Sequence, residues 1–149
     1  MTVSVHTFDD LDARTAYALW RLRQEVFVVE QDCPYPDLDG RDPEPGTVHV
    51  VMFEGDAVIG YARVLDDGDE WRIGRVVLAA AGRGRGLADR LMDGAVAACP
   101  GRDVVLDAQT PLAAWYAGFG FAVDGEEFLE DGIPHLPMRR AVGDVGFPA

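Results

Sequence analysis

Apolar and polar residues first alternate and then recur at helical spacing along the start of the chain. Residues 3–8 alternate apolar and polar side chains, which predicts a short strand. Between Thr15 and Val29, apolar residues recur every three or four positions, which predicts an amphipathic helix. We expect this helix to end near Glu30, because the segment Cys33-Pro34-Tyr35-Pro36 cannot continue it.

A long polar loop and three β-rich runs follow. The loop, residues 31–46, holds four prolines and five acidic residues. Loops of this length in compact domains tend to be functional or disordered. The runs 47–53, 57–65 and 71–78 are separated by turn signals and predict a three-stranded meander. The last run ends in Val76-Val77-Leu78 without alternation, which is typical of a strand buried on both faces.

The second half of the chain alternates between helical and strand patterns. We predict a helix, a buried strand, a short helix and a closing strand pair, over residues 87–98, 103–108, 111–117, 119–123 and 135–140. Residues 141–149 show no pattern, so we expect them to form a loose tail. The whole order of elements predicts an α/β layered architecture, as a single domain over residues 1–149.

Composition and charge narrow the classes of function. A chain of 149 residues that is 48% hydrophobic has enough apolar material for one core and one domain. The formal net charge of −13 disfavours nucleic acid and anionic membranes as partners. It favours a cationic small molecule or a basic peptide, although acidic residues can also serve solubility alone. Two distant cysteines, together with an N-terminus unlike a signal peptide, predict a cytoplasmic protein.

The glycine- and arginine-rich segment 83–88, Arg-Gly-Arg-Gly-Leu-Ala, lies between a predicted buried strand and a helix. Glycines at 82, 84 and 86 let the backbone approach a ligand with its N–H groups exposed, and the helix N-terminus adds positive potential. The segment lacks the third glycine of a dinucleotide fingerprint and the lysine of a Walker A loop. It matches a turn that holds the diphosphate of coenzyme A. The alternative is a tight turn that binds nothing.

Several further segments make the chain similar to a known family. The strand, loop and helix from Ile73 to Met92 resemble the acetyl-CoA-binding motif of the GNAT superfamily of N-acetyltransferases, and the whole chain resembles its ElaA-like branch. The segments that carry this resemblance are Leu22-Arg23, Val26 to Gln31, Cys33-Pro34-Tyr35, Asp37, Asp39-Gly40, Tyr61-Ala62-Arg63, Ile73 to Val76, Ala108-Gln109, Trp115-Tyr116, Phe119-Gly120-Phe121, Glu130 to His135 and Met138. They run from the first predicted helix to the last predicted strand.

The resemblance implies a GNAT fold with a mixed, mostly antiparallel central sheet, splayed between two parallel strands and flanked by helices. It also implies that acetyl-CoA is the co-substrate, and the spacing of histidines and cysteines indicates no metal site. The backbone of Val76, Val77 and Leu78 would contact the pantetheine arm, and the N–H of Val77 or Leu78 could polarise the thioester carbonyl. The residues implied in diphosphate binding are Arg83, Gly84, Arg85, Gly86, Leu87 and Ala88.

The resemblance further implies an acid that protonates the departing thiolate, at Tyr116. The alternative for Tyr116 is an aromatic that only lines the pocket. Candidates for the base are His135, Glu30, Asp131 and a chain of water molecules, and each of these side chains could instead be structural. Arg63 could position an anionic part of the acceptor or pair with one of the many carboxylates.

The acceptor and the exact reaction stay open at this point. We expect acetyl transfer to a primary amine of a small molecule or a basic peptide. The alternatives are a catalytically idle module that binds acyl-CoA and a transferase for a longer acyl group. The polar loop 31–42 could present carboxylates to a cationic acceptor or form a solvated lid. The histidines and cysteines have no metal-ligand spacing, and the oligomeric state is undetermined, with a homodimer as one alternative.

Overall fold

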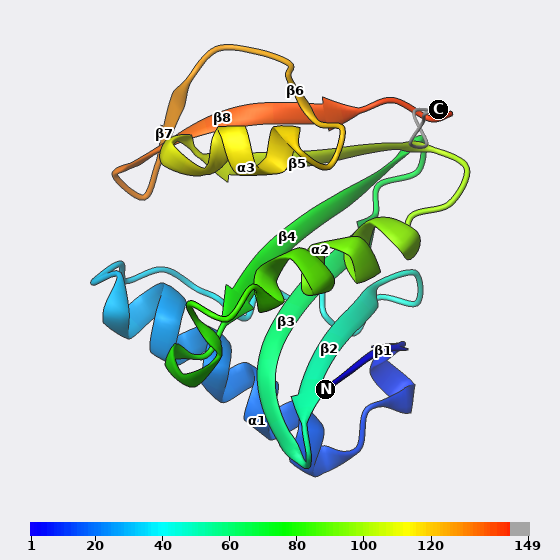
Figure 1. Cartoon of the computed structure of the whole chain (residues 1–149), viewed down its shortest axis with the longest axis vertical. Coiled ribbons are helices and arrows are strands. Elements are labelled where there is room, and N and C mark those ends of the chain that lie inside the picture. The colour runs from blue at the N-terminus through cyan, green and yellow to red at the C-terminus, as the bar shows by residue number, and fades with distance from the viewer. Residues whose placement is uncertain (144–149) are drawn as a thin grey trace.

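One sheet runs through the whole described chain (Figure 1). The structure is a computed structural model and describes residues 1–143. Its strands are β1 (Thr2–His6), β2 (Val48–Glu54), β3 (Ala57–Asp66), β4 (Glu70–Leu78), β5 (Asp103–Gln109), β6 (Ala122–Val123), β7 (Phe128–Glu130) and β8 (Ile133–Arg140). Its helices are α1 (Ala13–Arg23), α2 (Leu87–Ala97) and α3 (Ala113–Ala117), with a π-helical segment (Gln24–Glu30) and 3₁₀ turns at Phe8–Asp10, Ala80–Gly82 and Thr110–Leu112.

The sheet is mixed and mostly antiparallel, as predicted. Its strands lie in the order β1-β2-β3-β4-β5-β8-β6, and β7 pairs with β8. Only β4 and β5 are parallel within residues 1–143. They pair at three positions, from Glu70 opposite Asp103 to Arg72 opposite Val105, and then diverge. Figure 1 shows the two strands separating from this point, so the sheet opens into a V.

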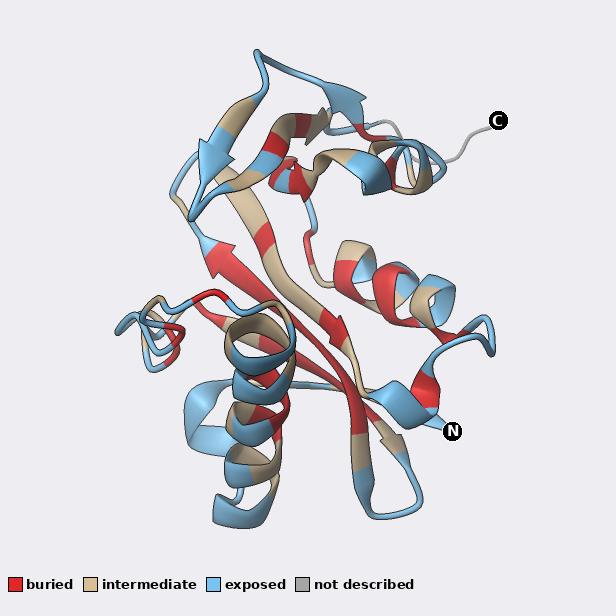
Figure 2. Cartoon of the chain, turned by 90° about the vertical axis from the view of Figure 1, so that its left-hand side faces the viewer, coloured by how far each residue is buried: buried red, intermediate tan, exposed pale blue. Residues whose placement is uncertain are grey.

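Helices α1 and α2 cover opposite faces of the strands β2 to β4 (Figure 2). Successive side chains of β2 alternate between the two faces because the strand period is two. Val51 packs with Leu19 and Leu22 of α1, while Val50 packs with Leu91 on the α2 side. Leu19, Val50, Val51 and Leu91 are each 0% exposed. Burying a side chain of this size stabilises the fold by about 1.5–3 kcal/mol, so these two layers hold the V-shaped sheet in place.

The first helix ends where the sequence predicts, but its last turns are π-helical. Backbone N–H groups at 31 and 33 donate to carbonyls five residues earlier, at Val26 and Val28. This wider turn changes the angle between successive side chains, so a spacing of three and four residues no longer marks one face. Val29, predicted on the apolar face, is therefore 66% exposed.

The C-terminal strands differ from the sequence prediction. The predicted strand 119–123 is reduced to β6, because Phe119 and Gly120 form the turn that ends α3 and donate to the carbonyls of Tyr116 and Ala117. The short strand β7 was not predicted at all, since its few residues give no periodic signal. Of the predicted tail, Val142 bonds through its N–H to Asp103, and residues 144–149 lie outside the described part of the chain.

The polar loop 31–46 is tied to the sheet by buried ion pairs. Arg23 of α1 is 0% exposed, and it donates to Asp37 (2.9 Å) and to Asp42 (2.6 Å) of this loop. Arg63 of β3 donates through both terminal nitrogens to Asp39, at 2.9 and 2.8 Å. Burial is the largest single influence and lowers the pKa of Arg23, but the hydrogen bond to Asp42 and the charges of Asp37 and Asp42 together raise it above its usual value. Asp37 and Asp42 are buried and Asp39 is exposed, and all three carboxylates fix the loop through these ion pairs.

None of the helices within residues 1–143 has the length and apolar composition that a membrane span requires.

Candidate active site

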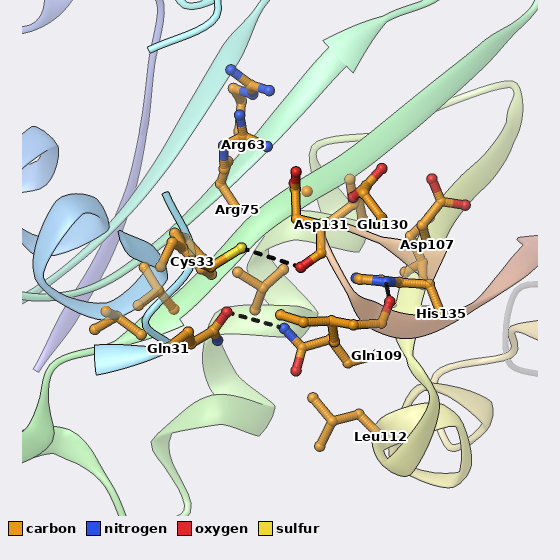
Figure 3. A pocket seen from close by; sticks show the side chains of 18 of the residues that line it. Gln31, Cys33, Arg63, Arg75, Asp107, Gln109, Leu112, Glu130, Asp131 and His135 are labelled. Atoms are coloured by element: carbon orange, nitrogen blue, oxygen red, sulfur yellow. Dashed lines mark hydrogen bonds between the residues drawn. The ribbon is translucent and has the colours of Figure 1, made fainter. Parts of the chain in front are cut away.

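A cavity of about 550 Å³ lies where β4 and β5 separate. Its walls come from the end of β4, from β5 and β8, from α3, and from the π-helical segment that follows α1. Figure 3 shows side chains from both arms of the V pointing into this space. Past Arg72, the β4 edge that faces β5 has no strand partner within residues 1–143. Free backbone groups along this edge can therefore bind an extended ligand.

A β-bulge in β4 shapes the floor of the cavity. The register with β3 shifts between Tyr61 and Arg63, and Arg75 opposite them has φ = +52°. A non-glycine residue in the left-handed region is strained, and bulges of this kind re-aim the residues that follow. After the bulge, Val76, Val77 and Leu78 all line the cavity. The structure thus places the three residues predicted to contact the pantetheine arm along the open edge.

The loop before α2 has the backbone geometry of an anion site. Gly84 and Gly86 both have φ = +73°, and a Cβ atom added at either would meet nothing within 4 Å. Gly86 is the N-cap of the eleven-residue α2, and no side chain caps it. The first N–H groups of α2 are thus available, with the positive end of the helix dipole behind them. A turn of this geometry can accept an anion through its backbone N–H groups.

The two arginines of the loop are held by exposed carboxylates. Arg83 lies 3.0 Å from Glu30, and Arg85 donates to Glu54. Exposed ion pairs contribute little to stability, so an incoming phosphate can displace these carboxylates. Leu87 packs into the core, which leaves its backbone N–H, like that of Ala88, as the group that could contact a ligand.

Tyr116 lies on α3 with its ring against Trp115 and Phe121, at centroid distances of 4.8 and 6.3 Å. It lines the cavity and is only 8% exposed. Its hydroxyl has no hydrogen-bond partner among the described residues. Burial raises the pKa of Tyr116 to about 12. The phenol is therefore protonated at neutral pH and can donate a proton into the cavity.

His135 lies on β8 directly opposite Gln109 of β5, and its ring points into the cavity (Figure 3). Its Nδ1 lies 2.7 Å from the carbonyl oxygen of Ile133, so Nδ1 carries the proton in the neutral ring and Nε2 is left as an acceptor. The ring stacks on Phe128 at 5.7 Å, which fixes its orientation. His135 and Tyr116 thus share one cavity, with a proton acceptor and a proton donor.

The remaining predicted residues lie around the same cavity but differ in their contacts. Glu30 lines it while pairing with Arg83. Asp131 lines it from the turn between β7 and β8, with φ = +50°. Arg63 also reaches it, but its two terminal nitrogens both bind Asp39. No group of three or more histidine, cysteine or acidic side chains within residues 1–143 is arranged to hold a metal ion.

Two contacts cross the cavity that the sequence did not predict. Gln109 of β5 donates to Gln31 at 3.4 Å, and the Cys33 thiol lies 3.6 Å from the carbonyl oxygen of Asp131 (Figure 3). Each joins the end of the π-helical segment to the opposite arm of the V. Residues 78 and 98 positions apart meet here, and no local sequence pattern signals such a meeting.

Comparison with known proteins decides the family. A family model described as an acetyltransferase (GNAT) domain matches residues 21–142. The chain belongs to the GNAT acetyltransferase family. It is similar to the UPF0039 protein Rv2851c of Mycobacterium tuberculosis, 47% identical over 136 residues, which are 88% of this chain and 87% of the relative. It is also similar to protein ElaA of Escherichia coli, 40% identical over 140 residues, 89% and 92% of the two chains.

Solved GNAT structures confirm the fold and the ElaA-like resemblance. The crystal structure of Escherichia coli ElaA has a TM-score of 0.90 and 37% identity, covering 94% of this chain and 99% of that one. An acyl-CoA N-acyltransferase from Pseudomonas aeruginosa has a TM-score of 0.89 and 39% identity, covering 95% and 100%. An aminoglycoside 6'-N-acetyltransferase complexed with coenzyme A, 15% identical with a TM-score of 0.68 over both whole chains, shows the shared fold alone.

Proposed function

We propose that this protein transfers an acetyl group from acetyl-CoA to a primary amine. The observation that carries the proposal is one cavity lined by the open β4 edge, by the buried side chains of Tyr116 and His135, and by Arg83, which leads into the open turn before α2. Membership of the GNAT family supports it, as does the likeness to a Pseudomonas aeruginosa protein described as an acyl-CoA N-acyltransferase.

The donor side of the proposal uses the backbone rather than charged side chains. Acetyl-CoA supplies an activated thioester, whose carbonyl carbon accepts the amine and whose sulfur leaves as a thiol. Turn residues 82–88 would hold the diphosphate through N–H groups, with Arg83 and Arg85 alongside. A backbone N–H at Val77 or Leu78 would stabilise the developing negative charge on the carbonyl oxygen.

His135 and Tyr116 line the cavity and are suited to the two proton transfers. An alkyl ammonium with a pKa near 10.4 costs about 4–5 kcal/mol to deprotonate at pH 7, so a base beside it is valuable. His135 offers Nε2 as the acceptor, because Nδ1 is occupied by the Ile133 carbonyl. Glu30 is less suited, since it already binds Arg83. Tyr116, protonated at neutral pH, would give its proton to the departing sulfur.

The same proposal places the reaction in the cytoplasm. Cys33 and Cys99 are both free and buried, as expected for a protein of a reducing compartment. Burial raises the pKa of the Cys99 thiol to about 12, so this side chain stays protonated and inert.

The test is to incubate the protein with acetyl-CoA and a panel of amines while following both free thiol and acetylated amine. We expect amine-dependent thiol release that falls by about 10²–10⁴-fold in Tyr116→Phe, with little change in coenzyme affinity. Full turnover in Tyr116→Phe would show that another group protonates the sulfur. Coenzyme binding without thiol release on any amine would mark the protein as an idle acyl-CoA-binding module.

A further inference from the structure

The arginines that line the cavity are all paired with carboxylates. Five arginines line it, and each lies within 4 Å of at least one carboxylate. The pairs are Arg41 with Glu44 and Asp67, Arg63 with Asp39 and Asp42, Arg72 with Asp67 and Asp107, Arg75 with Asp37 and Asp39, and Arg83 with Glu30. No lining arginine is therefore left to bind an anionic acceptor without displacing a carboxylate of the protein itself.

Two lining carboxylates have no such partner. Glu130 and Asp131, at the turn from β7 to β8, form no ion pair with any residue of the described chain. Figure 3 shows both side chains on the same side of the cavity as Asp107, whose carboxylate is 3.2 Å from Arg72. This rim of the cavity therefore carries unneutralised negative charge, which attracts a cation.

Two buried residues that line the cavity have polar atoms without a hydrogen-bond partner. The Tyr116 hydroxyl and the Nε2 atom of His135 have no hydrogen-bond partner among residues 1–143, although each residue is only 8% exposed. Neither atom is fully enclosed by protein, so a ligand in the cavity can reach both and supply the missing hydrogen bonds. Both groups line the same cavity as the two free carboxylates. The site thus offers a proton acceptor inside and negative charge at its rim.

We infer that the acceptor is an alkyl diamine, with one amino group at His135 and the second, as an ammonium, between Glu130 and Asp131. The inference rests on the proposed acyl transfer to an amine and names its substrate class. Glu130 pairs with Ile133 in the β7–β8 ladder, two residues before His135. Residues placed diagonally across two paired strands in this way are about 7–8 Å apart. A chain of four methylenes, with bonds of about 1.5 Å, separates its two nitrogens by about 6 Å, which matches this spacing.

The reaction balances as amide formation at one end only. One ammonium of the diamine loses a proton, its nitrogen bonds to the acyl carbon, and the carbon–sulfur bond breaks. The products are the N-acyl amide, the coenzyme thiol and one proton released to solvent. The second ammonium keeps its proton and its charge throughout, so it contributes binding energy alone.

The experiment compares 1,4-diaminobutane with butylamine, which lacks the second charge, at saturating acetyl-CoA. We expect wild-type kcat/KM to favour the diamine by about tenfold or more. The double variant Glu130→Gln with Asp131→Asn should bring this ratio close to one. Asparagine suits position 131 because it tolerates the left-handed backbone there. The matched control is Glu126→Gln, an exposed residue outside the cavity lining, which should leave the ratio unchanged.

The outcomes separate this inference from the proposed function. Equal wild-type kcat/KM for the two amines, or a preference for 4-aminobutanoate, would overturn the diamine site while acyl transfer stands. If no amine is acylated, the proposed function fails, and calorimetry with 1,4-diaminobutane alone then decides the site. Diamine binding that the double variant weakens by tenfold or more supports the inference. The absence of diamine binding to the wild-type protein overturns it.

Discussion

The turn before α2 can be tested by placing one negative charge in it without changing its shape. Gly86 has φ = +73° and ψ = 12° at the N-cap, in open space. Aspartate and asparagine tolerate this left-handed backbone better than other side chains, and they differ only in charge. Gly86→Asp and Gly86→Asn therefore share any backbone strain, and their difference in coenzyme affinity isolates the electrostatics of the turn.

The size of the effect follows from the exposure of the loop. A unit charge about 5 Å from another interacts by ~0.8 kcal/mol in bulk water and by ~3 kcal/mol at an effective dielectric constant of about 20. Gly84, Arg85 and Gly86 are all exposed, so we expect the interaction energy to lie between these limits. We expect the aspartate variant to bind coenzyme A about tenfold more weakly than the asparagine variant. Its thermal stability should not fall, because a carboxylate at a helix N-terminus interacts favourably with the dipole.

The assay is calorimetric titration of both variants with coenzyme A and with S-acetylpantetheine, which has no diphosphate. The aspartate variant should lose affinity for coenzyme A alone, and the loss should shrink at high salt. Equal coenzyme A affinity in the two variants, or an equal loss for S-acetylpantetheine, would refute the assignment of the turn as a diphosphate site.

Three further predictions concern the buried charges and the titrating groups. Arg23→Met should lower the free energy of unfolding by about 3–5 kcal/mol in urea titrations, because it leaves the buried carboxylate partners of Arg23 without a positive charge. The control Arg21→Met, which removes an exposed ion pair, should lower it by under ~0.5 kcal/mol. Equal losses in the two variants would contradict the buried network. Burial raises the pKa of Tyr116 to about 12, so above pH 10 the unfolded chain binds fewer protons than the folded one. The free energy of unfolding should therefore fall by about 3 kcal/mol between pH 10 and 12, and less steeply in Tyr116→Phe. Identical slopes for the two proteins would contradict this contribution. Glu30→Gln should release Arg83 from its ion pair and raise the affinity for the coenzyme by up to about fivefold, while kcat stays unchanged. A large drop in kcat would instead identify Glu30 as the base.

The elements with strong local signals were predictable from the sequence. Alternation and helical spacing locate β2 to β5 and α2 to within one or two residues, since their side chains face a core on a regular period. The glycines of the turn before α2 were also identified, because only glycine takes its left-handed positions without strain. The residues proposed to bind a diphosphate there were assigned from this glycine pattern together with the resemblance to the GNAT family.

Features made by distant residues could not be predicted. From the sequence, loop 31–42 could present its carboxylates to a cationic acceptor or form a solvated lid. The structure shows that Arg23 of α1 and Arg63 of β3 bind carboxylates of this loop instead. The π-helical segment breaks the regular spacing on which the pattern depends. The contact of Gln31 with Gln109, and the free carboxylate of Glu130, likewise depend on how the two arms of the V meet.

A crystal structure with acetyl-CoA bound would test the central claim most directly. The account predicts the diphosphate against backbone N–H groups of residues 84–88, with Arg83 released from Glu30. It also predicts the pantetheine arm along Val76 to Leu78 and the thioester sulfur within hydrogen-bond reach of the Tyr116 hydroxyl. A coenzyme bound outside the V between β4 and β5, or a sulfur remote from Tyr116, would contradict it.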